Sequence, residues 1–221
     1  MFKLPSVKLV NPLILKLHNN PDEYEERLTK AKYKLPDIFD GIVDRYIDPT
    51  DSVLDLGCGT GAVAKVLQAH NHSGNRIAND ISGSMIDYVL AEKLYAEGYH
   101  GTSLELVEKM KSDNQMIDWA ISLSVFYYLP PEEMEKNLQV LYKVSNKGMI
   151  ISLDGIPPQF ADYIEATLGK RLELYDHRGY FESHKIPAGW SAQVVYSGFG
   201  WQSSNTGIEI PTDLVVLRKY K

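Results

Sequence analysis

The stretch from Val53 to Gly61 constrains the fold more than any other part of this sequence. Its apolar start predicts a short buried strand, its three glycines predict a turn, and the residues after them predict a helix over 63–70. Because glycine has no Cβ and reaches positive φ at little cost, the backbone N–H groups of such a turn can close on a polar ligand. Asp55 lies two residues before the first glycine, where its carboxylate either orders the turn or meets a cationic ligand.

These nine residues resemble the first motif of class I S-adenosylmethionine (SAM) methyltransferases, and the resemblance covers roughly residues 36–155. It implies an α/β fold: a single Rossmann-like, doubly wound sheet of about seven strands with an antiparallel last strand. It also implies that SAM, and after transfer S-adenosylhomocysteine, is the bound cofactor. The cofactor contacts implied for this turn are Asp55, Gly57, Gly59 and Gly61. The same residues also permit a tight strand-to-helix turn that holds no ligand.

Asp80 follows the next predicted strand, 23 positions after Gly57. This offset places a carboxylate at the tip of the second parallel strand, within reach of two vicinal hydroxyls of a ribose. The residues 81–85 resemble the methyltransferase segment in which the acid is followed by a turn and by a methionine beneath the adenosine. The resemblance therefore implies that Met85 also contacts the cofactor. The alternative is a solvated aspartate in a turn.

The ends of the third and fourth predicted strands supply further candidates. By resemblance, Ser103 and Leu104 would meet the adenine, although the acid that is common there in the family is absent. Residues 116–124 predict a buried fourth strand, and its small end implies that Ser122 and Leu123 leave room for the methionine part of SAM. Tyr127 follows and is either a site residue or a filler at the start of the next helix.

Two segments predict covers for this site. Residues 1–50 are expected to form an N-terminal arm and lid helices, with Tyr24 and Tyr33 as the lid residues that contact the cofactor by resemblance. Residues 156–190, rich in Tyr, His and Trp, are expected to form a substrate cap after the fifth strand. A dimer contact or a simple surface insertion would explain the same stretch.

The end of the chain is open to two interpretations. Residues 191–197 predict a last helix that ends at glycine, but the run Val194–Tyr196 equally suits a strand. Residues 201–205 and 213–219 are expected to form the closing antiparallel pair.

The reaction needs few catalytic groups, because methyl transfer depends mainly on position and on the exclusion of water. Where a general base is used, His184 of the cap is the first candidate and Tyr127 the second. No metal is expected, because the fourth strand ends in Ser-Leu-Ser, without the acids that metal-dependent catechol-type enzymes carry there.

Composition narrows the classes of partner. A length of 221 residues suits one domain over 1–221, and a net charge of -6 argues against nucleic acid. The single cysteine, Cys58, fits a reducing compartment, and no apolar run is long enough for a membrane span. We therefore expect a cytoplasmic protein with a small-molecule substrate and no membrane partner. The sequence also permits a homodimer.

Three functions compete. The first is SAM-dependent methyl transfer to an oxygen or nitrogen atom of a small, partly apolar metabolite. The second is an NAD-dependent oxidoreductase, because Gly57, Gly59 and Ala62 also satisfy the dinucleotide fingerprint; against it, none of the 14 tyrosines has a lysine four residues on. The third is a SAM-binding or interaction module without turnover.

Overall fold

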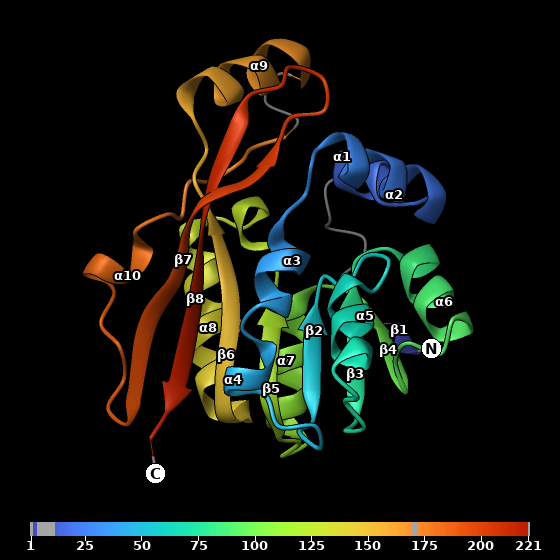
Figure 1. Ribbon diagram of the computed structural model, residues 1–221. Helices are drawn as coiled ribbons and strands as arrows, with labels where there is room; N and C mark the ends of the chain where they lie inside the picture. Colours follow the sequence, from blue (N-terminus) through green and yellow to red (C-terminus); the bar gives the residue numbers. More distant parts are fainter. Residues whose placement is uncertain (1, 4–11, 169–171, 221) are drawn as a thin grey trace.

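The computed structural model describes residues 2–3, 12–168 and 172–220 (Figure 1). Residues 1 and 4–11 of the predicted arm and residues 169–171 of the predicted cap lie outside the described residues. Within the described chain, the strands are β1 (Phe2–Lys3), β2 (Val53–Leu56), β3 (Arg76–Asp80), β4 (Glu97–His100), β5 (Ile117–Ser122), β6 (Ser145–Asp154), β7 (Trp190–Gln202) and β8 (Glu209–Lys219).

These strands form one sheet in the order β1-β4-β3-β2-β5-β6-β8-β7. The pairs from β1 to β6 are parallel, and β8 is antiparallel to β6 and to β7. After β1 at the edge, the chain enters the middle of the sheet at β2, moves outward to β4, and returns to β5 on the other side of β2. The two-residue β1 at the edge apart, this is the predicted sheet of about seven strands with an antiparallel last strand.

Helices cover both faces of the sheet, as the alternation of buried side chains requires. Leu54 and Leu56 of β2 face the cluster that contains helices α7 and α8, whereas Val53 faces the cluster formed with α3 and α5. The helices are α1 (Pro12–Leu17), α2 (Pro21–Lys30), α3 (Leu35–Asp40), α4 (Val43–Tyr46), α5 (Ala62–Ala69), α6 (Gly83–Ala91), α7 (Ser103–Ser112), the 3₁₀-helix η2 (Phe126–Tyr128), α8 (Pro131–Val144), α9 (Pro158–Leu168) and α10 (Tyr180–Ser183).

The carboxyl ends of the parallel strands are where chemistry is expected in a doubly wound sheet. Helices α1, α2 and α9 lie at this end of the molecule, beyond the body of the sheet, although they come from opposite ends of the chain (Figure 1). Helix α2 begins at Pro21, and the Asn20 side chain accepts hydrogen bonds from the N–H groups of Asp22 and Glu23. None of the described helices is long and apolar enough to cross a membrane.

The predicted helix over residues 191–197 is wrong, and the strand interpretation is confirmed. These residues belong to β7, which pairs with β8 from Trp190 to Gln202. A Cβ on Gly200 would overlap the side chain of Thr212 in β8, so this glycine marks a close strand approach rather than a helix end. Two register shifts in β7 accommodate the length of the hairpin.

Candidate cofactor and substrate site

The glycine turn after β2 has the backbone conformation that its residues predict. Gly57, Gly59 and Gly61 all have positive φ, at 72°, 49° and 83°. A Cβ on Gly57 would overlap the side chain of Val125, so only glycine fits there. The N–H groups of Gly57 and Cys58 both donate to the carbonyl of Asn79, at 2.8 and 2.9 Å, which fixes the turn against β3.

Asp80, the last residue of β3, is held by the same turn. Its Oδ2 accepts a hydrogen bond from the Gly59 N–H at 2.9 Å, and its Oδ1 accepts one from the Ser82 N–H at 2.8 Å. Burial raises the pKa of Asp80 to about 6, and the two backbone hydrogen bonds oppose that rise. The carboxylate is therefore oriented before any ligand arrives and is largely ionised above neutral pH.

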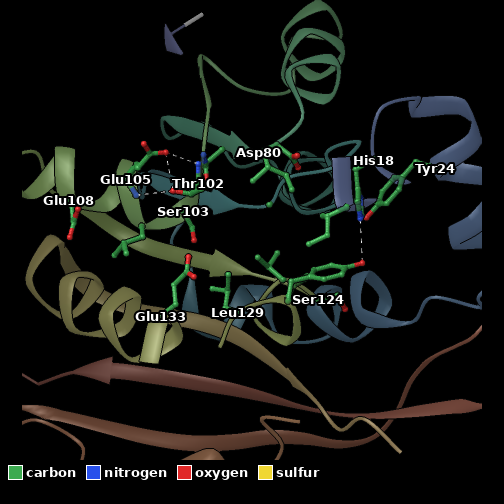
Figure 2. Close-up of a pocket in the computed structure, with 18 residues that line it drawn as sticks. His18, Tyr24, Asp80, Thr102, Ser103, Glu105, Glu108, Ser124, Leu129 and Glu133 are labelled. Atoms are coloured by element: carbon green, nitrogen blue, oxygen red, sulfur yellow. Dashed lines mark hydrogen bonds between the residues drawn. The ribbon is translucent and has the colours of Figure 1, made fainter. Parts of the chain in front are cut away.

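A cavity of about 450 Å³, here called the larger cavity, opens beside Asp80 at the ends of β2, β3 and β5. It brings together six of the predicted cofactor residues, which come from five separate segments of the chain. These are Tyr24, Gly57, Asp80, Ser103, Leu104 and Leu123. Figure 2 shows Asp80 and Ser103 on one wall, with Glu133 and Leu129 opposite and His18 and Tyr24 toward one end.

Five other predicted cofactor residues do not line this cavity, and the structure places them behind its wall. Gly59 and Gly61 shape the turn. Asp55 is buried and accepts a hydrogen bond from Tyr95 Oη, and burial raises its pKa to about 7. Met85 packs in the core and Ser122 is buried at the end of β5.

The larger cavity is acidic. Four carboxylates line it, and no lysine or arginine does so among the described residues. Glu105 is partly engaged, since it closes a capping box with Thr102 at the start of α7. Glu108 and Glu133 were missed by sequence reasoning, because single acids on helices are ordinary and carry no motif.

A second cavity of about 310 Å³, here called the aromatic cavity, lies between α2, α9 and the tip of the β7–β8 hairpin. Rings form most of its wall, and neighbouring rings contact one another. Tyr127 lies 4.1 Å from Tyr128 and 5.7 Å from Trp201 between ring centroids, and Phe160 meets Trp201 edge-to-face at 5.7 Å. The predicted lid residue Tyr33 lies in this cavity rather than in the larger one.

The two cavities adjoin at four residues that line both of them, here called the junction: His18, Tyr24, Ser124 and Tyr128. His18 packs against the Tyr24 ring at 5.1 Å, and its Nε2 lies 3.5 Å from Tyr128 Oη. Burial, helped by the nearby charge of Arg27, lowers the pKa of His18 to about 4. At neutral pH this imidazole is therefore uncharged.

His184 is not one of the residues at this junction. Its Nδ1 lies 3.1 Å from Glu135 Oε2 on α8, its ring stacks on Tyr180 at 4.8 Å, and it lines neither cavity. A general base must reach the reacting proton, and His184 is not among the residues that line either cavity. The second candidate, Tyr127, does line the aromatic cavity, but burial raises its pKa well above the usual value.

Only part of the predicted cap over 156–190 lines a cavity. Helix α9 and the residues Leu172 and Leu174 line the aromatic cavity, as a cap would. Tyr180, Phe181 and Ile186 instead pack on the core cluster that contains α8, and Trp190 begins β7. No group of three or more His, Cys, Asp or Glu side chains suited to a metal is found among the described residues.

Comparisons with known proteins agree with the sheet order. Residues 53–148, from β2 into β6, match the sequence model of the family described as methyltransferase domain. The segment includes the glycine turn and Asp80. The match confirms the predicted resemblance to methyltransferases, whereas no curated protein matches the sequence.

Solved structures share the fold at low sequence identity. Magnesium protoporphyrin IX methyltransferase from Synechocystis PCC 6803 with bound SAM is 15% identical, with a TM-score of 0.57 over 96% of this chain and 97% of that one. A mycolic acid cyclopropane synthase in complex with S-adenosylhomocysteine is 13% identical, with a TM-score of 0.61 over 97% and 99%. A plantazolicin methyltransferase in complex with S-adenosylhomocysteine is 14% identical, with a TM-score of 0.55 over 91% and 88%.

Proposed function

Because residues 53–148 match the family described as methyltransferase domain, we propose that this protein is a SAM-dependent enzyme that methylates an oxygen or nitrogen atom of a small, partly apolar metabolite. The observation that carries the proposal is the pair of adjoining cavities, one acidic and one aromatic. SAM occupies the larger cavity and the acceptor occupies the aromatic cavity. Methyl transfer takes place at their junction, between His18, Tyr24, Ser124 and Tyr128.

The larger cavity fits SAM on three counts. Asp80 offers an ionised, oriented acceptor for the ribose hydroxyls. Gly57 lines the cavity, and its positive φ shapes a turn whose backbone can approach a ligand closely. Four carboxylates and no lysine or arginine line the cavity among the described residues, so the pyrophosphate of NAD would meet negative charge without a compensating cation. The related structures named above, solved with SAM or S-adenosylhomocysteine, also support this cofactor.

When bound, SAM supplies an electrophilic methyl group that an acceptor lone pair displaces in line. The protein's part is to hold the acceptor and to exclude water, which the rings of Tyr24, Tyr128 and His18 do at the junction. We assign the base role to His18 in place of His184. Its uncharged imidazole accepts the proton of an acceptor hydroxyl or amine at the ring nitrogen that carries no hydrogen.

The test is the release of S-adenosylhomocysteine, followed by mass spectrometry, when the protein and SAM are incubated with a panel of small hydroxylated and amine acceptors. The proposal predicts SAM binding without any acceptor and turnover with a subset of the panel. Binding without turnover on any acceptor would favour the non-catalytic module. Methylation confined to protein or nucleic acid would contradict the assignment of a small acceptor.

A further inference from the structure

One cation in the wall of the aromatic cavity has no anionic partner among the described residues. Arg27 of α2 lines this cavity, and its Cζ lies 5.7 Å from the centroid of the Tyr24 ring. Its Nε is shielded from solvent and has no hydrogen-bond partner within the part of the chain that the structure describes. A shielded guanidinium donor without an acceptor is costly, so a ligand that supplies one would be favoured.

The acids nearest in sequence are engaged elsewhere. Glu25 forms an ion pair with Lys65 at 3.2 Å, and Glu26 lies 3.8 Å from Lys30 one turn further along α2. No aspartate or glutamate lines the aromatic cavity among the described residues. Within the described lining, Arg27 therefore faces no carboxylate and is accompanied by no lysine or second arginine.

The rest of the cavity specifies the body of the ligand. The rings of Tyr127, Trp201 and Phe160 form a continuous wall with centroid separations of 5.7 Å between neighbours. Flat apolar surface of this kind favours a planar aromatic body, which it can meet by stacking or edge contacts. A volume of about 310 Å³ is at the small end for ligand pockets, which suits one or two rings.

We propose that the methyl acceptor is an aromatic carboxylate, whose ring packs between these side chains and whose carboxylate pairs with Arg27. The inference rests on the proposed function, because it names the acceptor class of the same site. A carboxylate matches the planar fork of one guanidinium with two oxygens. A phosphate dianion would call for further donors of positive charge, and Arg27 is the one lysine or arginine in the described lining.

The experiment compares two probes of the same shape, 1-naphthoate and its neutral isostere 1-naphthamide. Their dissociation constants are measured by calorimetry with saturating S-adenosylhomocysteine, for wild type, Arg27→Gln, Arg27→Lys and Lys30→Gln. Lys30→Gln is the matched control, because it removes one positive charge from the same helix outside both cavities. Thermal unfolding and S-adenosylhomocysteine affinity show that each variant is folded.

Wild type and Lys30→Gln are expected to bind naphthoate at least about tenfold more tightly than naphthamide, as for one charge-assisted pair. Arg27→Gln should reduce that ratio to less than about threefold, and Arg27→Lys should retain part of it. Equal affinities in wild type, a ratio that survives in Arg27→Gln, or no binding of either probe would overturn the inference. Each of these results leaves the methyltransferase assignment intact when S-adenosylhomocysteine still binds, whereas failure to bind it would contradict the proposed function instead.

Discussion

Replacing Asp80 by alanine tests the ribose contact on which the cofactor assignment depends. In the structure each carboxylate oxygen accepts one backbone N–H, at 2.8 and 2.9 Å, and keeps a lone pair for a ligand. With a pKa raised to about 6, Asp80 is mostly ionised at pH 7.5, so it can accept from both ribose hydroxyls. The expected result is weaker binding of S-adenosylhomocysteine at pH 7.5.

The magnitude follows from the exchange of these hydrogen bonds with water. A hydrogen bond to a charged group contributes a net 1.5–3 kcal/mol at most, and the two oxygens already share their charge with Gly59 and Ser82 N–H, so we expect about 2 kcal/mol in total. This corresponds to roughly a 30-fold rise in the dissociation constant, which calorimetry measures directly.

Asp118→Ala is the matched control, because it also removes a carboxylate that accepts a backbone N–H. Asp118 accepts hydrogen bonds from the N–H and the Oγ of Ser52, both at 2.8 Å, but it lies at the other end of the sheet from the cavities. This variant should lose stability and keep its affinity for S-adenosylhomocysteine. A change of less than threefold in a folded Asp80→Ala protein would refute the ribose assignment.

Three further predictions follow from the same site. Affinity for S-adenosylhomocysteine should fall by up to about tenfold per pH unit below pH 6, because Asp80, with its pKa raised to about 6, takes up a proton and becomes a poorer acceptor. Calorimetry should show this slope in wild type and not in Asp80→Asn. His18→Gln should lower kcat about 10²-fold with little change in cofactor affinity, and an unchanged kcat in steady-state assays would remove His18 as the base. Gly57→Ala should reduce the free energy of unfolding, measured in urea, by about 1–3 kcal/mol. Adding Val125→Ala should recover the part of this loss that comes from overlap with Val125, and the cost of the positive φ should remain. If the second change recovers nothing, overlap contributes nothing to the loss.

Local patterns predicted the parts of the site that lie close together in sequence. The strand, the glycine turn and the helix after it are adjacent, so glycine chemistry and apolar spacing define them without tertiary information. Asp80 could also be predicted, because its distance in sequence from Gly57 is set by one strand-helix-strand unit. Ser103, Leu104 and Leu123 likewise line the larger cavity, each at the end of a strand or the start of the helix that follows.

Residues brought in by tertiary packing could not be predicted in this way. His18 lies in a short segment before α2 without a motif, and it meets Tyr128 only because α1 and α2 lie over the carboxyl edge of the sheet. His184 has the composition of a cap residue, but the connection after α9 turns back along α8, where Glu135 binds it. Residues 191–197 carry no strong period, and it is the pairing with β8 that makes them a strand.

The most direct test of the central claim is calorimetric titration of the wild-type protein with SAM, S-adenosylhomocysteine and NAD at pH 7.5. The adjoining cavities and the turn at Gly57 predict one binding site per chain for SAM and for S-adenosylhomocysteine, and no measurable heat with NAD. Binding of NAD without binding of SAM would contradict the account and would favour an NAD-dependent oxidoreductase instead.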